Sequence, residues 1–230
     1  MSEYFDFKKV ELDDPLIEEV YRLRYKVYCD EWGFERPEDH PEGVEKDEYD
    51  DYSLHYVAIA KRDAQVIGTI RLILASPYGF PIEQHCTIDV DRSHIDPGCL
   101  AEVSRLAISK DYRRRASDNL LYEGHELPDQ ESRRLAIERR KADNEIVLGL
   151  YMCVFRECMQ RPGIHIYMAM ARGLHLLLKR VGFFFDPAGP EIDYHGLRAP
   201  YLTSFQSIRD RLAEVNPEYA RLCAGVTSAH

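Results

Sequence analysis

The sequence predicts one α/β domain over residues 1–230, and three observations carry this prediction. The expected elements follow one another as helix, hairpin, strand, helix, strand, helix and strands, an order that favours helices packed on a sheet over a barrel or a bundle. A chain of 230 residues can bury a substantial core without disulfides or a structural metal. No internal repeat and no glycine motif of the GxGxxG or GxxxxGK[ST] type occurs.

The N-terminal third is predicted as a helix, a loop and a hairpin. Apolar residues recur at three- and four-residue intervals over residues 15–29, which indicates an amphipathic helix. Residues 35–51 carry nine acidic and two basic side chains, interrupted by prolines and a glycine, and are expected to form a long acidic loop. Two β-rich runs, 54–60 and 65–74, flank a polar turn and predict the hairpin.

The rest of the chain is predicted as strands and helices around an insertion. Residues 100–108 form a strongly apolar strand, after which a basic turn at 110–115 leads into a polar insertion, helical or irregular, at 116–143. The elements expected after it are a helix at 144–160, a strand at 163–169, a helix at 172–181, strands at 183–186 and 197–205, and a helix at 207–222.

Composition excludes several classes of protein. A formal net charge of −10 disfavours a general nucleic-acid binder, which would carry a basic field. The six cysteines form no C-x-x-C pair and the nine histidines no H-E-x-x-H motif, so we expect reduced thiols and no metal site. Charges occupy the place of a signal peptide's apolar run, and the longest apolar stretch, residues 146–155, is too short for a membrane span. These features predict a cytoplasmic protein.

Three polar residues stand out in the apolar strand at 100–108, namely Glu102, Ser104 and Arg105. Burying an unpaired ion costs several kcal/mol as an order of magnitude, so such groups are normally paired, hydrated at a cleft or in contact with a substrate. Regular alternation would place Glu102 and Ser104 on one face and Arg105 on the other, so the three address one ligand only if the strand bulges.

Polar and aromatic residues earlier in the chain complete a pattern with these three. An arginine, an aromatic residue four positions later and a tryptophan are followed by two aspartates in the acidic loop and by an arginine in the hairpin. The set in order is Arg24, Tyr28, Trp32, Asp47, Asp50, Arg71, Glu102, Ser104 and Arg105. It resembles the LuxI-type autoinducer synthases and, more closely, the N-acyl amino acid synthases of the PEP-CTERM/exosortase-associated type, which have the GNAT acyltransferase fold. The segment 192–201 also resembles the exosortase-associated group.

The resemblance implies a fold and an activity. The fold is the GNAT acyl-CoA N-acyltransferase-like one, a central mixed, twisted sheet flanked by helices, with a bulged, splayed central strand near residues 103–105. The activity is transfer of a fatty acyl group from an acyl carrier protein thioester to the amine of an amino acid. The implied partners are acyl carrier protein and a small-molecule amino acid. No tightly bound cofactor is implied, since the 4′-phosphopantetheine of the carrier protein, or coenzyme A, brings the acyl group.

Amide formation from a thioester needs a neutral amine and a stabilised tetrahedral oxyanion. Glu102 is the candidate base that removes the proton of the substrate ammonium, directly or through one water. Its alternative role is a strand-edge carboxylate paired with an arginine. Ser104 is a candidate for a hydrogen bond to the acyl donor, or it is satisfied by the backbone. His195 is a rival candidate for the base.

The charged residues of the pattern have two possible roles. Arg24, Arg71 and Arg105 organise the acidic loop or bind the substrate carboxylate, because a guanidinium pairs with a carboxylate through two hydrogen bonds. Asp47 and Asp50 attract the substrate ammonium or pair with these arginines. The alternatives are structural ion pairs and a solvated acidic loop.

Aromatic residues near the first helix belong to the predicted substrate site. The resemblance makes Tyr28 and Trp32 substrate-binding residues, and Trp32 and Phe34 are expected to close the amino-substrate pocket. The alternative is that these large side chains anchor the loop in the core. Tyr194, His195, Arg198 and Tyr201 are suited to a family-specific pocket, without an assigned role.

Arg113, Arg114 and Arg115 are the candidate acyl-donor site. They follow the central strand where GNAT proteins bind phosphate at a helix N-terminus, and a basic turn also suits an acidic carrier protein. Ala116 and Ser117 stand in place of that loop's usual glycines, which disfavours a simple acetyl-coenzyme A enzyme. An exposed charge run is the alternative.

Two further functions remain open. One is an acyl-homoserine-lactone synthase that uses S-adenosylmethionine. The other is a non-catalytic acyl-binding sensor.

Overall fold

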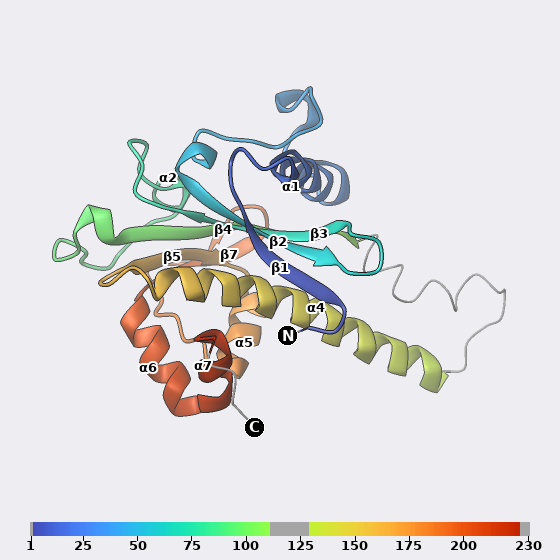
Figure 1. The fold of residues 1–230 in the computed structure, drawn as a ribbon. Helices are drawn as coiled ribbons and strands as arrows, with labels where there is room; N and C mark the ends of the chain where they lie inside the picture. Colours follow the sequence, from blue (N-terminus) through green and yellow to red (C-terminus); the bar gives the residue numbers. More distant parts are fainter. Residues whose placement is uncertain (1, 111–128, 226–230) are drawn as a thin grey trace. The chain divides into compact units, whose positions relative to one another are not determined.

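The computed structural model describes residues 2–110 and 129–225, with the backbone alone over 129–143. The strands form a seven-stranded sheet in the order β1-β2-β3-β4-β5-β7-β6 (Figure 1). β4 and β5 are parallel, whereas β7 is antiparallel to both β5 and β6. Helices flank this mixed sheet, so the predicted fold class is confirmed.

The elements have the following bounds. The strands are β1 (Phe5–Val10), β2 (Ser53–Ala60), β3 (Val66–Ile73), β4 (Leu100–Ile108), β5 (His165–Met170), β6 (Ile192–Asp193) and β7 (Leu197–Ser204). The α-helices are α1 (Leu16–Tyr25), α2 (Pro81–His85), α4 (Asp129–Cys158), α5 (Arg172–Val181), α6 (Phe205–Val215) and α7 (Pro217–Cys223). A π-helix, η1 (Lys26–Glu31), and three 3-10 turns, η2 (Pro37–Asp39), η3 (Asp50–Tyr52) and η4 (Pro97–Cys99), complete the set.

The chain groups into two compact units, each treated by itself below. Unit 1 consists of the described parts of Met1–Lys46, Tyr56–Thr69 and Leu106–Tyr151. Unit 2 consists of the described parts of Asp47–His55, Ile70–Arg105 and Met152–His230.

In unit 1, α1 and α4 pack on strand residues through small or apolar side chains. Val20 and Tyr21 of α1 share a buried cluster with Val10 and Val57. A Cβ built on Gly149 of α4 would lie 2.2 Å from the ring of Phe7 on β1. Any larger residue at this close approach of α4 to β1 would therefore force the Phe7 ring to move.

The first helix changes its winding after Tyr25. The N–H of Trp32 donates to the carbonyl of Val27, five residues back, at 3.2 Å, which is the π pattern of η1. The chain leaves the helix through Gly33, whose φ of +61° suits a residue without a Cβ. The helix predicted over 15–29 is present, but its last part is wound as a π-helix. A spacing of three and four apolar residues does not indicate this change of winding.

In unit 2, the core lies around Tyr167 of β5, where α2 packs. α5 and α6 pack on β7, and α7 lies beside α6 (Figure 1). The buried cluster consists of Tyr49, Ile73, Phe80, Ile82, Cys86, Ile95, Leu100 and Tyr167. α2 and the segment after it thus cover the same part of the sheet that carries Leu100 and Tyr167.

Two late elements differ from the prediction. Residues 183–186 are irregular and do not form a strand. Phe183 and Phe185 are buried, so the apolar residues here indicated burial correctly but not secondary structure. The helix expected at 207–222 is interrupted at Asn216, whose side chain accepts the N–H of Tyr219 and caps α7, with Pro217 in the first turn.

Other elements were not predicted or have other bounds. β1, α2 and β6 are too short or too polar to give a clear periodicity. α4 begins at Asp129 and not at residue 144, because the charged stretch before Asn144 is rich in strong helix formers. The rest of the predicted insertion, 116–128, lies outside the described residues. Within the described residues, none of the helices has the length and apolar character needed to cross a membrane.

Candidate active site

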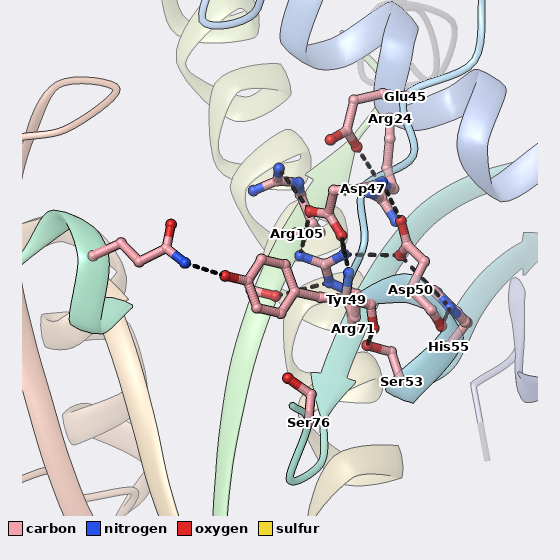
Figure 2. Close-up of polar contacts among 12 residues, drawn as sticks. Arg24, Glu45, Asp47, Tyr49, Asp50, Ser53, His55, Arg71, Ser76 and Arg105 are labelled. Atoms are coloured by element: carbon pink, nitrogen blue, oxygen red, sulfur yellow. Dashed lines mark hydrogen bonds and ion pairs between the residues drawn. The ribbon is translucent and has the colours of Figure 1, made fainter. Parts of the chain in front are cut away.

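Arg71 of β3 is the centre of a buried charged cluster in unit 2. Arg71 is 0 % exposed. Nη1 donates to Oδ1 of Asp47 at 2.6 Å and to Oδ1 of Asp50 at 2.8 Å, and Nη2 donates to Oδ2 of Asp47 at 3.0 Å. Figure 2 shows both carboxylates directed at this guanidinium. The fork of donors thus neutralises two carboxylates, a geometry that lysine cannot supply.

The acidic loop turns around this arginine because its aspartates also bind its backbone. The N–H of Asp47 donates to Oδ2 of Asp50 at 2.8 Å, and the N–H of Tyr49 donates to Oδ1 of Asp47 at 3.0 Å. Nε2 of the buried His55 lies 3.7 Å from Oδ1 of Asp50. Side-chain bonds of this kind replace regular structure in loops. The pair of aspartates, spaced by three residues, is therefore structural as well as charged.

The backbone of β4 departs from regular alternation at Arg105. Its φ is +50°, in the left-handed region that residues other than glycine rarely adopt. The parallel register with β5 runs from Leu100 paired with His165 to Val103 paired with Met168. The irregularity expected near residues 103–105 is therefore present, at the point where the pairing with β5 has ended.

This irregularity brings neighbours in sequence onto one cluster. Oγ of Ser104 accepts a hydrogen bond from Nε of Arg71 at 3.0 Å. Nη2 of Arg105 donates to Oδ2 of Asp47 at 3.2 Å. Two consecutive side chains thus reach the Arg71–Asp47 pair, which regular alternation would not allow. Five residues of the predicted pattern therefore meet in unit 2, namely Asp47, Asp50, Arg71, Ser104 and Arg105.

Glu102 lies on β4 two residues before Ser104 and is 4 % exposed. Its Oε2 accepts a hydrogen bond from the backbone N–H of Ile82, in α2, at 2.9 Å. Burial raises the pKa of this carboxyl to about 7. The Ile82 hydrogen bond and the charges of Arg71 and Arg105 oppose this rise, while Asp47 adds to it. The expected strand-edge carboxylate bound to an arginine is not the geometry found, because the partner is a backbone amide.

A carboxyl with a pKa near 7 is suited to take and return a proton at neutral pH, since general bases work best when their pKa lies near the operating pH. A glutamate with the ordinary pKa of 4.5 would be a much weaker base. The environment of Glu102 therefore gives it the acid–base property that was expected only from the resemblance.

Tyr49 and Gln84 extend this region and were not singled out from the sequence. Nε2 of Gln84 donates to the hydroxyl of Tyr49 at 2.5 Å. The rings of Tyr49 and Tyr52 each lie edge-on to that of Tyr78, at 6.2 and 6.0 Å between centroids. Tyr52 and Tyr78 are exposed, so this aromatic group reaches the surface. No periodicity in the loops containing them could have indicated the grouping.

Arg24 belongs to unit 1, where it forms a buried ion pair with Glu45. The guanidinium also lies 5.4 Å from the ring centroid of Tyr21. Glu45 was not singled out from the sequence, since the acidic loop offers many equivalent carboxylates. The structural alternative for Arg24, pairing with the acidic loop, is the contact that the structure shows.

The aromatic residues of the pattern also lie in unit 1. The hydroxyl of Tyr28 donates to the carbonyl of Leu106 at 3.2 Å. Trp32 is 50 % exposed, its ring is stacked on that of Phe34 at 5.7 Å, and Nζ of Lys110 lies 3.8 Å from its centroid. Trp32 is therefore a partly exposed plane with a cation on it, and not an anchor buried in the core.

The late polar residues lie around the β6–β7 turn of unit 2. The ring of Tyr194 is stacked on that of His85, at 4.2 Å, and His195 has a φ of +53°. The guanidinium of Arg198 donates to the carbonyl of His195. Tyr201 is stacked on His175 at 4.8 Å. None of these contacts joins His195 to Glu102.

The remaining candidates can be placed only in part. Arg113, Arg114 and Arg115, together with Ala116 and Ser117, lie outside the described residues. All six cysteines have free thiols. Across 2–110 and 129–225, no group of three potential metal ligands comes together.

Comparison with known protein families and structures gives the fold a name. The family model described as "Acetyltransferase (GNAT) domain" matches residues 23–123. A search of curated proteins found no match. The matched part includes the end of α1, the acidic loop, β3 and β4, and therefore every residue of the predicted pattern from Arg24 to Arg105.

Solved structures of similar fold cover nearly the whole chain. TofI, in a ternary complex with an inhibitor and MTA, matches at a TM-score of 0.60 and 16% identity, over 92% of this chain and 95% of its own. BjaI, described as a CoA-dependent acyl-homoserine lactone synthase with SAM and isopentyl-CoA, matches at 0.61 and 18%, over 97% and 91%. FeeM, described as an N-acyl amino acid synthase from uncultured soil microbes, matches at 0.52 and 12%, over 90% and 93%. At these identities the likeness shows the GNAT-like fold.

Proposed function

We propose that this chain is an N-acyltransferase that moves a fatty acyl group from an acyl carrier protein thioester to the amine of an amino acid. The observation that carries the proposal is Glu102, a buried carboxyl on the central strand with a pKa raised to about 7. It lies three residues before the left-handed backbone of Arg105. The match to the acetyltransferase domain over residues 23–123 and the fold shared with acyl-homoserine lactone and N-acyl amino acid synthases support the acyltransferase class.

The proposed reaction needs no covalent bond to the enzyme. Glu102 accepts a proton from the substrate ammonium, directly or through a water, and leaves a neutral amine. The amine nitrogen attacks the thioester carbonyl, the C–N bond forms, and collapse of the tetrahedral intermediate breaks the C–S bond. The protons of the amine go to Glu102 and solvent, and the thiolate takes one back. We place the thioester carbonyl beside β4 after Val103, where the register with β5 ends.

The charged cluster of unit 2 suggests separate roles for its members. The side chains of Arg71 and Asp50 are 1 % and 0 % exposed, whereas those of Asp47 and Arg105 are 18 % and 15 % exposed. We therefore assign the contact with the amino acid to Asp47, for the ammonium, and to Arg105, for the carboxylate. Arg71 and Asp50 hold these two in place, and Ser104, bound to Arg71, is fixed in the same cluster.

Several residues keep the roles that the resemblance suggested, as part of the same proposal. Within unit 1, Arg24, Tyr28 and Trp32 keep the substrate-binding role that the resemblance suggested, Arg24 indirectly from its buried ion pair with Glu45 and Trp32 through an exposed ring face. The basic segment from Arg113 to Arg115 receives the phosphopantetheine or the carrier protein. The exosortase association and a cytoplasmic location belong to the proposal on the same basis.

An acyl-homoserine lactone synthase is the second candidate. BjaI, whose structures are described with SAM and with MTA, matches at a TM-score of 0.61, above the 0.52 of FeeM. In this case the amine that attacks the thioester would belong to S-adenosylmethionine, and lactone closure would release methylthioadenosine. Coenzyme A as acyl donor is a further alternative, since BjaI is described as CoA-dependent.

Mass spectrometry of reactions with the purified chain separates these possibilities. Acyl carrier protein or coenzyme A thioesters are offered with either the twenty amino acids or S-adenosylmethionine, and products are compared between the wild type and Glu102→Gln. Glu157→Gln, which changes a partly buried carboxylate paired with Arg161, is the matched control.

We expect an N-acyl amino acid whose rate of formation falls roughly 100- to 10,000-fold in Glu102→Gln and is unchanged in Glu157→Gln. Methylthioadenosine and an acyl lactone would instead support the second candidate. Binding of acyl carrier protein thioester without any product would indicate an acyl-binding sensor and refute the enzyme.

A further inference from the structure

The Ile82 N–H that donates to Glu102 belongs to α2, a helix too short to be stable without contacts to the rest of the protein. α2 has five residues, from Pro81 to His85. Isolated helices shorter than roughly 12–15 residues are marginal in water, so such a turn keeps its direction only through side-chain contacts. The N–H of Ile82 points at Oε2 of Glu102 only while α2 keeps that direction.

Three polar side chains join α2 to the strand beside Glu102. Nη1 of Arg92, in the segment after α2, donates to Oε1 of Glu83, the residue that follows Ile82. The same nitrogen donates to the hydroxyl of Tyr167 on β5 at 2.5 Å. The Tyr167 hydroxyl also donates to Oε1 of Glu83 at 3.5 Å. We call this group the Glu83–Arg92–Tyr167 clamp.

Strand register puts the fixed end of this clamp beside Glu102. Glu102 of β4 pairs with Tyr167 of β5, so the two side chains leave adjacent strands on the same face of the sheet. Tyr167 is 0 % exposed, and its ring lies 5.7 Å from that of Phe80, the residue that precedes α2. The ring therefore packs on the start of α2, and the hydroxyl holds the residue after Ile82.

We propose that Glu83, Arg92 and Tyr167 are positioning residues that aim the Ile82 amide at the Glu102 carboxylate. The catalytic consequence rests on the proposed function, in which Glu102 is the base. The hydrogen bond itself and the titration of Glu102 do not depend on that function. Loosening the clamp withdraws a donor that stabilises the ionised carboxylate, so Glu102 becomes harder to ionise.

The other charged and titratable groups around Glu102 are not themselves altered by substitutions in the clamp. They come from β3, from β4, from the acidic loop and from the end of α2. Those that act on Glu102, or on which its charge acts, are Arg71, Arg105, Asp47, Tyr49 and Cys86. None of these is a member of the clamp. Tyr49 accepts a hydrogen bond from Gln84 of α2 and Cys86 follows α2, so the response of the Ile82 amide itself is what assigns a change in the titration of Glu102 to this donor.

Tyr167→Phe and Glu83→Gln test the clamp, with Tyr219→Phe as a control that removes a hydroxyl from α7. Tyr167→Phe keeps the ring that packs on Phe80 and excludes water. The protein is labelled with 13C at glutamate carboxyls, Glu102→Gln assigns the Glu102 signal, and both this signal and the Ile82 amide proton are followed from pH 4 to 9 by NMR. The pH dependence of kcat/KM is measured on the same variants.

In the wild type we expect the carboxyl signal and the Ile82 amide to titrate together near pH 7. In Tyr167→Phe and Glu83→Gln the carboxyl midpoint moves up by roughly 0.5–1 unit, the Ile82 amide loses its response, and the acid limb of kcat/KM follows. Tyr219→Phe behaves as the wild type.

An unchanged midpoint in both clamp variants, or a downward one that indicates entry of water, overturns the proposal. A midpoint that moves as expected while Glu102→Gln keeps full activity overturns the role of Glu102 as base and leaves the clamp standing. The two failures are therefore distinguishable.

Discussion

Nε of Arg71 donates to the hydroxyl of Ser104 at 3.0 Å, so the serine that lies two residues from Glu102 on β4 is oriented by a side chain of β3. The same guanidinium binds two aspartates of the acidic loop. One residue thus connects three segments that are distant in sequence. A change at Arg71 is expected to alter the loop, the strand and the acid–base group together.

Replacing Arg71 by Leu is expected to lower the free energy of unfolding by about 3–5 kcal/mol, because it leaves buried carboxylates without their cation. Arg71→Lys is expected to lower the free energy of unfolding less, because the positive charge is kept. Some loss remains because lysine lacks the forked donors of the guanidinium. Urea denaturation measures both values. Arg36→Leu, which removes the exposed pair with Asp39, is the control and should cause no measurable change. A loss in Arg71→Leu as small as that control would contradict the cluster.

The free energy of unfolding should decrease as the pH rises, because of Glu102. Its folded pKa of about 7 lies above the ordinary value of 4.5, so the folded state binds this proton more tightly than the unfolded state does. The stabilisation is complete below pH 4.5 and is lost as the pH rises to about 7, and it amounts to about 3 kcal/mol as an order of magnitude. Glu102→Gln should remove this decline. Urea denaturation of both proteins at pH 4.5, 6 and 7.5 checks it, and parallel profiles would contradict the raised pKa.

The buried pair of Arg24 and Glu45 in unit 1 should show strong coupling. Arg24→Met or Glu45→Leu alone is expected to cost about 3–5 kcal/mol, because each leaves the other charge buried. The double variant should recover most of the loss, since two apolar side chains replace a desolvated ion pair. A double-mutant cycle by urea denaturation gives the coupling energy. Purely additive losses would show that the two residues do not depend on each other.

Gly149→Ala tests the close approach of α4 to β1. Alanine is normally favoured over glycine inside a helix by about 1 kcal/mol, but its Cβ would lie 2.2 Å from the ring of Phe7. We expect a net loss of about 1–3 kcal/mol from this overpacking. In the background of Phe7→Ala, the same change should become neutral or stabilising. Thermal denaturation of the wild type, the two single variants and the double variant measures these effects. A stabilising Gly149→Ala in the wild-type background would be inconsistent with the contact.

Residue type and order indicated the charged cluster, but not its geometry. Pairing of Arg71 and Arg105 with Asp47 was one of the two roles expected from their charges, the other being contact with the substrate. That Arg105 joins the cluster depends on a left-handed backbone at a residue other than glycine, which no local preference favours. The resemblance suggested the irregular strand, and the positive φ locates it.

The partners of Glu102 could not be found from the sequence for a different reason. A backbone N–H such as that of Ile82 is present at every residue but proline, so it carries no signal in the sequence. Tyr167 lies beside Glu102 only through the register of two parallel strands separated by the whole of α4. Both contacts depend on non-local pairing, which periodicity within one segment does not contain.

The π-helix at Lys26–Glu31 has a consequence for the geometry of Trp32. A helix of this kind contains one residue more per turn than an α-helix would need, and an α-helix advances by about 100° per residue. Deleting a single residue within this segment would let α1 continue as an α-helix and would rotate the exposed indole about the helix axis by that angle. The direction in which Trp32 faces is therefore determined by the number of residues in this segment, and not by the identity of their side chains.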